Sequence, residues 1–247
     1  MRLDIQMKLR LTYLLFIFNH ILFGQLPKQE TLKINKVYLI IGKSTSDKQE
    51  STPFDTHFYI DTLGQIVKEV NYFKNQTNDS MVTIYSYKNN RLVHEKRISE
   101  KDNYLWEQIF VDSASRIINI KSKGASLTQK IKLDYKDNTY KTFINDTLST
   151  IIKFTKSKDK RTYTKKEIHP YLTSYSFGKE YLDKNGQIEL STVKVNRKGL
   201  SQYPIKKKKY TSTKKFKYDD RSFLIQTTDF HTSDNATTTT IYSYYTR

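Results

Sequence analysis

A degenerate repeat runs through most of the chain and constrains its fold more than any other feature. Each copy has an apolar or aromatic pair, a polar turn of about four residues and a second apolar segment. Four consecutive turns open at Asp61, Lys88, Asp112 and Lys136, at intervals of 27, 24 and 24 residues. Asp183 follows 47 residues later, so a worn copy is expected at residues 155–163. Such even spacing predicts a series of strand–turn–strand units.

The residue types in these units favour antiparallel β-hairpins. Asn, Asp and Gly dominate the turns, and they tolerate the left-handed backbone that tight hairpins require. The chain holds 19 Tyr and 13 Phe, and aromatic side chains suit a pleated, half-buried surface. We therefore expect an all-β fold, an antiparallel meander of repeated hairpins that forms a curved single sheet or a sandwich. No helix is predicted after residue 24.

Two copies of the repeat resemble a known family. They are Tyr59/Asp61/Gly64/Ile66 and Tyr181/Asp183/Gly186/Ile188, each with a tyrosine, an aspartate, a glycine and then an apolar residue. This pattern resembles the YD-type (RHS-like) repeats of exported bacterial proteins. The resemblance implies an extended β-sheet scaffold and no particular activity. Evenly spaced hairpins of an ordinary β-sandwich produce the same spacing, so both interpretations stay open at this point.

The N-terminus has the character of a secretion signal. Lys8 and Arg10 precede an apolar stretch at 11–18, and Gly24 follows a second short apolar run. A basic start, an apolar stretch of about 7–15 residues and a small residue at the cut describe a signal peptide. We predict a signal peptide at 1–24, a linker at 25–33 and a repetitive β domain at 34–247, without a transmembrane helix after the signal is removed.

Charge and cysteine content narrow the compartment and the partners. The chain has 247 residues, a net charge of +18 and no cysteine, so disulfides and thiolate chemistry are excluded. An exported protein without disulfides is more typical of a bacterial envelope than of a eukaryotic secretory route. The expected location is the periplasm, the outer-membrane surface or the exterior. The positive charge favours an anionic glycan, a lipid headgroup or an acidic envelope protein as partner.

The sequence holds no catalytic or metal-binding signature. His57, His94, His169 and His231 are widely separated, and no zinc-helix spacing, nucleophile elbow or phosphate loop is present. We therefore predict that the protein is not an enzyme and uses no cofactor or metal ion.

Two basic clusters are the candidate functional residues, as an anion-binding surface. The first cluster contains Lys206, Lys207, Lys208, Lys209, Lys214, Lys215 and Lys217. The second runs Lys153, Lys156, Lys158, Lys160, Arg161, Lys165 and Lys166, and Lys158, Lys160 and Arg161 are its candidate site residues. Aromatic residues are interleaved with both, as in surfaces that bind polyanions. If residues 210–218 form a strand, Tyr210, Lys214 and Phe216 share one face and Lys215 and Lys217 the other. The competing interpretation is an edge strand that lysines protect against aggregation.

Three functional hypotheses follow. The first is a non-enzymatic exported β-repeat scaffold or adhesion protein that contacts anionic envelope polymers or lipids through its lysine-rich faces. The second is a periplasmic carrier of a lipid or lipoprotein with a curved sheet. The third is a hydrolase whose site is assembled from distant residues. Nucleic acid is disfavoured as a partner, because an exported chain rarely meets it and lysine outnumbers the better base reader, arginine.

Overall fold

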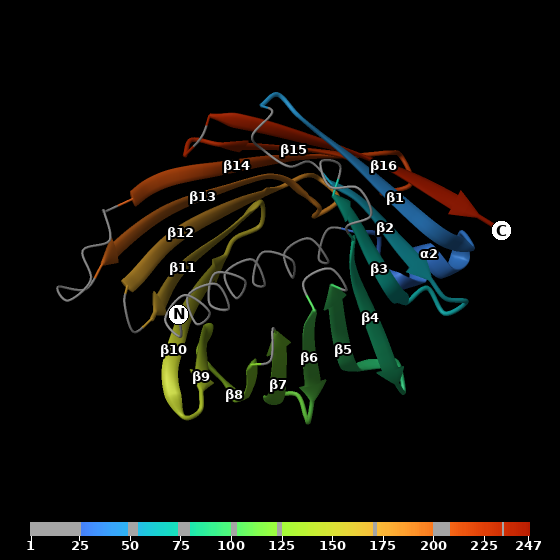
Figure 1. Ribbon diagram of the computed structural model, residues 1–247. Coiled ribbons are helices and arrows are strands. Elements are labelled where there is room, and N and C mark those ends of the chain that lie inside the picture. Colours follow the sequence, from blue (N-terminus) through green and yellow to red (C-terminus); the bar gives the residue numbers. More distant parts are fainter. Residues whose placement is uncertain are drawn as a thin grey trace.

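The computed structural model describes residues 26–48, 54–73, 80–99, 103–122, 125–169, 172–199, 208–233 and 235–247. One short helix precedes a long series of strands (Figure 1). The elements are α2 (Gln29–Ile34), β1 (Val37–Ser46), β2 (Phe54–Ile60), β3 (Ile66–Phe73), β4 (Ser80–Lys88), β5 (Arg91–Ser99), β6 (Tyr104–Phe110), β7 (Ser115–Ser122), β8 (Ala125–Lys136), β9 (Thr139–Ile144), β10 (Thr147–Lys156), β11 (Lys160–Ile168), β12 (Leu172–Leu182), β13 (Ile188–Gly199), β14 (Lys208–Tyr218), β15 (Leu224–His231) and β16 (Ala236–Thr246). The predicted signal peptide at 1–24 lies outside the described residues.

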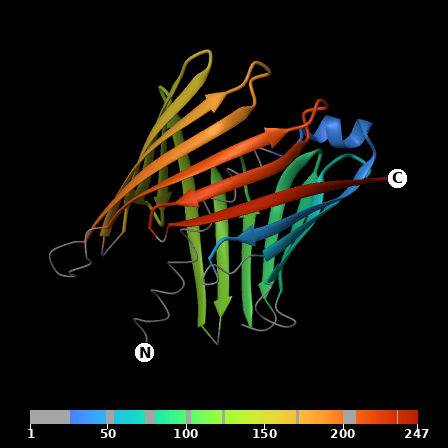
Figure 2. The same cartoon turned by 90° about the horizontal axis from the view of Figure 1, so that it is seen from above.

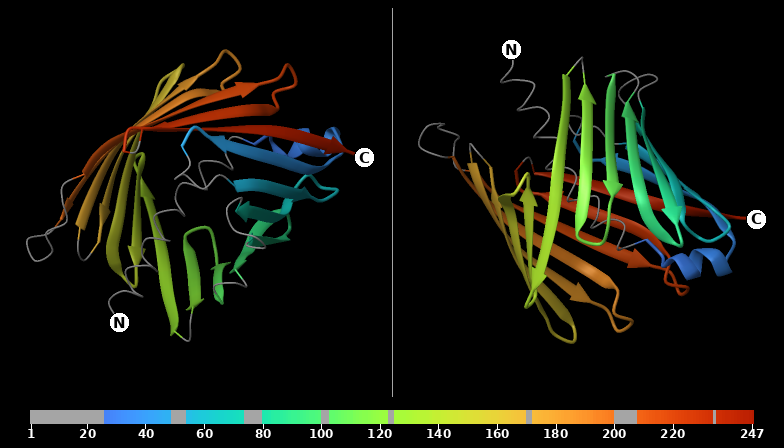
Figure 3. Two further views of the ribbon diagram at one scale, coloured as in Figure 1. Left: turned by 45° about the horizontal axis from the view of Figure 1, so that its top comes forward. Right: turned by 90° about the horizontal axis from the view of Figure 1, so that it is seen from below.

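The strands form a closed antiparallel barrel. Each strand pairs with its neighbour in sequence, and β1 pairs with β16 to close the ring. The continuous wall can be followed in Figures 1 and 3. The all-β antiparallel meander is confirmed, whereas the expected curved single sheet or sandwich is wrong. Closure satisfies the hydrogen-bonding groups that the first and last strands of an open sheet would expose.

The repeat predicted from the sequence corresponds to one hairpin of this barrel. Asp61, Asp112 and Asp183 each accept hydrogen bonds from backbone N–H groups of their own turn, at 2.6–2.9 Å. Asn89 and Asn90 adopt positive φ in the turn that Lys88 opens. The worn copy is confirmed as the β10–β11 turn. All these turns join an even-numbered strand to the next odd one, so they lie at one end of the barrel, which we call the turn end.

Alternate residues of each strand lie on opposite sides of the wall. Register partners can be followed from strand to strand across β1–β7, and the seven residues in this row lie on the same side of the wall. They are Ile40, Phe58, Glu69, Thr83, Arg97, Trp106 and Ile120. All seven are buried. Because side chains crowd together on the concave side of a barrel, this is the inner face, and the alternate residues form the outer face.

The helix α2 packs on the inner face at the turn end (Figure 2). Its Leu32 is 2% exposed and contacts a cluster that includes Ile40, Phe58 and Phe223. This helix lies almost wholly in the segment expected to be a linker, 25–33, and the expectation of no helix after residue 24 is wrong. Sequence patterns do not indicate this helix, because one buried leucine in a turn and a half shows no helical periodicity. Within the described residues, no helix is both long and apolar enough to cross a membrane.

Candidate anion-binding site

The first basic cluster does not form one surface, because a strand turns its residues to opposite sides. Residues 208–218 form β14, as predicted. The register places Lys209, Lys215 and Lys217 on the outer face and Lys214 on the inner face, with Tyr210 and Phe216. Lys206 and Lys207 lie outside the described residues, and Lys208 is described only in its backbone. The outer lysines are exposed, so they remain candidates for anion binding.

Lys214 has a partner inside the barrel. Its Nζ lies 3.9 Å from Oδ2 of Asp229, and the other carboxylate oxygen, Oδ1, accepts a hydrogen bond from Ser212 Oγ at 3.0 Å. Burial lowers the pKa of Lys214, and the Asp229 carboxylate opposes that shift. The structure therefore separates this lysine from Lys209 and gives it an internal carboxylate, so it adds nothing to an outer surface.

The second cluster is also divided. Lys158 lies exposed in the β10–β11 turn. Lys160 begins β11 on the outer face, with its Nζ 5.8 Å from the ring centroid of Tyr181. Arg161 lies on the inner face opposite Glu180, whose pKa is raised by burial and lowered in part by the Arg161 charge. Lys160 alone of these three lies within a strand on the outer face.

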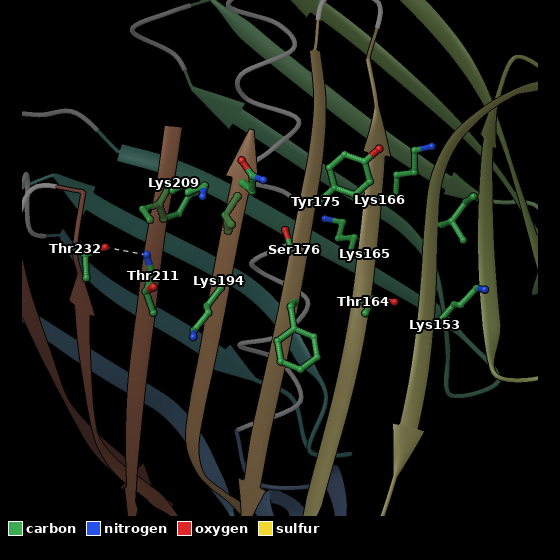
Figure 4. A pocket seen from close by; sticks show the side chains of 15 residues that line it. Lys153, Thr164, Lys165, Lys166, Tyr175, Ser176, Lys194, Lys209, Thr211 and Thr232 are labelled. Carbon is green, nitrogen blue, oxygen red and sulfur yellow. Dashed lines mark hydrogen bonds between the residues drawn. The ribbon is translucent and has the colours of Figure 1, made fainter. Parts of the chain in front are cut away.

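A hollow of about 830 Å³ on the outer face of β10–β14 brings together lysines from four of these five strands (Figure 4). Its floor consists of two rows of register partners, one residue from each strand. The first row is Ile151, Lys166, Tyr175, Asn196 and Lys209. The second row is Lys153, Thr164, Phe177, Lys194 and Thr211. We call these ten residues the lysine hollow. Thr232 lies beside this group, and its Oγ1 accepts a hydrogen bond from the backbone N–H of Thr211 at 2.8 Å.

The centre of the lysine hollow is aromatic and its sides are cationic. Tyr175 and Phe177 are 48% and 39% exposed. Lys166 places its Nζ 5.8 Å from the Tyr175 ring centroid, and Lys179 lies 5.4 Å from that of Phe177. Both distances permit cation–π attraction. Lys165 also borders the hollow, but it belongs to the inner face and pairs with Glu167 at 2.6 Å.

Lysines continue beyond the hollow along the outer face of β10–β14, whereas Lys141 of β9 faces Asp134 of β8 across a strand pair. Among the register-paired residues described for β10–β14, none on this face is an aspartate or glutamate. The opposite wall differs, because Lys43 faces Asp55 and Lys96 faces Glu107 across strand pairs there. The lysine hollow therefore lies in a part of the outer wall where the described register partners include several lysines and no carboxylate.

Sequence reasoning missed Lys194, Tyr175 and Phe177. A usable signal existed in their alternation with Lys179, Asn196 and Lys198, since every second residue of β12 and β13 shares a face. The predicted clusters followed runs of lysine along the chain instead. In a strand such runs divide between two faces, whereas a surface is built across neighbouring strands.

The described histidines do not form a metal-binding cluster. Within the described part of the chain, no three His, Cys, Asp or Glu side chains lie close enough to hold a metal ion. His94 lies 3.7 Å from Glu107 on the outer face, and His231 lies 3.5 Å from Asp229 on the inner face. His94 and His231 are thus each the partner of a single carboxylate.

Comparison with known proteins supports the fold alone. No family model matches the chain, and no curated protein matches it. A solved structure of a porin-like protein from Bacteroides uniformis aligns with a TM-score of 0.51 and 9% identity, over 85% of this chain and 97% of that chain. This likeness agrees with the closed barrel described above. The resemblance to YD-type repeats stays a prediction.

Proposed function

We propose that this protein is a non-enzymatic barrel that binds anionic polymers of the cell envelope through the outer face of β10–β14. The observation that carries the proposal is the lysine hollow, where four lysines from four strands surround two exposed rings and none of the fifteen lining residues is a carboxylate. Such a surface attracts polyanions and loses affinity as salt screens it. Protection of an edge strand against aggregation does not explain these lysines, because a closed barrel has no edge strand.

The outer wall is suited to water rather than to hydrocarbon. A barrel that spans a membrane presents an apolar band about 25 Å tall, and a lysine at the bilayer midplane costs about 2–4 kcal/mol. Here Lys153, Lys194 and Lys209 are exposed on three different strands of one wall. On the opposite wall Lys43 and Lys68 are exposed as well. We infer that the protein works in an aqueous compartment beside the envelope polymers.

Export to that compartment rests on the predicted signal peptide. Mass spectrometry of the protein from fractionated host cells should find a mature N-terminus near Gln25 in the periplasmic, surface or extracellular fraction. An intact N-terminus in the cytosol would remove the envelope polymer as the partner.

A lipid carrier is the second candidate, and an aromatic ladder on the inner face favours it. Tyr135, Tyr140 and Phe154 come from consecutive strands, with ring centroids 4.4 Å and 5.5 Å apart, and all three are exposed. Exposed rings on a concave wall provide apolar surface for an acyl chain. Mass spectrometry of organic extracts from the purified protein tests this function, which requires a stoichiometric lipid that Phe154→Asp removes.

A binding assay with polygalacturonate tests the proposed anion site. Replacing Lys153, Lys194 and Lys209 together with Gln should weaken binding roughly tenfold, since exposed charge pairs contribute about 0.5 kcal/mol each. The matched control replaces three exposed lysines elsewhere on the outer face, Lys43, Lys68 and Lys121, and removes the same charge. Equal loss in both variants would show a general charge effect and contradict a site at the hollow.

A further inference from the structure

We propose that the lysine hollow recognises an acidic polysaccharide, with Tyr175 and Phe177 holding sugar rings while the lysines hold the acidic groups. This inference rests on the proposed function and names the class of polymer. A surface that needed only charge would not place two exposed aromatic rings at the centre of its lysines.

The two rings form a platform along one strand. Tyr175 and Phe177 are two residues apart on β12, so their side chains leave the same face about 6.7 Å from each other. The face of an aromatic ring is negative and attracts the weakly positive C–H groups of a sugar ring. The ammonium groups of Lys166 and Lys179 lie over the Tyr175 and Phe177 rings, 5.8 Å and 5.4 Å from the ring centroids. One sugar unit therefore finds a ring face and a cation side by side.

The lysines are spaced for a chain rather than for a single headgroup. In the first row Lys166 and Lys209 are three strands apart, and in the second row so are Lys153 and Lys194. Three strand spacings of about 4.8 Å give roughly 14 Å between their backbone positions. The four lysines are therefore spread across the wall, and a chain with an acidic group on successive units can contact several of them at once. The site thus favours a polymer over a lipid headgroup.

The remaining side chains match a hydroxyl-rich ligand. Thr164, Asn196 and Thr211 lie in the same rows as the rings and lysines, and their hydroxyl and amide groups both donate and accept hydrogen bonds. Sugar hydroxyls also donate and accept. A nucleic-acid site would instead favour arginine, which reads bases and phosphates with a planar pair of donors. The hollow has no arginine among its lining residues.

The experiment compares three probes on the full-length protein: polygalacturonate, inorganic polyphosphate and a single-stranded oligonucleotide. Tyr175→Leu with Phe177→Leu should weaken polygalacturonate binding at least roughly tenfold, the size expected when stacked rings are lost. Polyphosphate binding should stay within about twofold, because that polymer has no ring to stack. The control pair, Phe230→Leu with Tyr245→Leu, removes two exposed outer-face rings elsewhere and should change neither.

Each outcome decides between the two proposals. Equal loss of polygalacturonate and polyphosphate binding in the ring variant, with unchanged circular dichroism, would overturn the sugar assignment. Tighter wild-type binding to the oligonucleotide than to polygalacturonate would overturn it in favour of nucleic acid. Absence of wild-type binding to every polyanion would instead refute the proposed function itself. A ring variant that fails to fold is replaced by Tyr175→Gln alone, which keeps a long side chain and loses the ring.

Discussion

Gly64 holds α2 against the turn end of the barrel, and replacing it should release the helix. Its φ is +79°, and a Cβ at this position would collide with the backbone carbonyl of Gln29 and lie 3.0 Å from the backbone N of Lys33. The Gln29 side chain also donates to the Leu63 carbonyl at 3.0 Å. The turn and the helix are therefore packed backbone to backbone, and no side chain fits between them.

Gly186 provides a matched control for this position. It occupies the same place in the β12–β13 turn, with φ +76°, but nothing lies within 4 Å of an added Cβ. Gly186→Ala should therefore cost only the left-handed backbone term, about 1–2 kcal/mol. Gly64→Ala should cost the same amount plus the burial of Leu32, which contributes about 1.5–3 kcal/mol. The expected loss at Gly64 is thus about 2.5–5 kcal/mol.

Urea unfolding measures both losses, and amide hydrogen exchange identifies the cause. The Gly64→Ala variant should exchange rapidly at 29–34, while Gly186→Ala keeps the protection of the wild type. If the two variants lose equal stability, or if the helix stays protected in Gly64→Ala, the helix is not anchored at this turn and the reasoning is refuted.

Three further predictions concern the inner face. Burial raises the pKa of Tyr104 and of Tyr163 to about 12. Because these pKa values are raised only in the folded protein, the neutral phenols contribute fully to the free energy of unfolding below pH 10, and this contribution is lost as pH rises toward 12. Ultraviolet titration should show late phenolate formation in the folded protein, and titration of these tyrosines near pH 10 would contradict the prediction. Trp106→Ala should lower the free energy of unfolding by about 3–5 kcal/mol, because the indole is 1% exposed; a loss below 1 kcal/mol in urea unfolding would show that the site collapses. Lys214→Gln should leave polygalacturonate affinity unchanged within about twofold, since this lysine faces Asp229 inside the barrel; a larger drop would place it on the binding surface.

Local structure was predictable because it depends on neighbouring residues. The turns at Asp61, Asp112 and Asp183 follow from carboxylates that accept hydrogen bonds from the next few N–H groups, and this chemistry is visible in the sequence. The strand face of Lys214 followed from the two-residue period alone. Such features require no knowledge of distant partners.

Barrel closure and the lysine hollow were not predictable, because both depend on pairing between residues that are far apart in the sequence. The pairing of β1 with β16 joins Val37 to Thr246, and no turn between them signals it. The lysine hollow joins residues from 151 to 211, and their meeting depends on the register of four strand pairs. A slip of one residue in any pair would move a whole strand's side chains to the other face, so local patterns do not determine the surface.

The salt dependence of binding tests the central claim most directly. Polygalacturonate affinity is measured over a range of salt concentrations for the wild type, the Lys153/Lys194/Lys209→Gln variant and the Lys43/Lys68/Lys121→Gln control. We predict that the logarithm of the binding constant falls linearly with the logarithm of salt concentration, as bound counterions are released, and that the slope is smaller in the hollow variant than in the wild type and the control. Affinity that does not respond to salt, or slopes equal in all three proteins, would contradict anion binding at the lysine hollow.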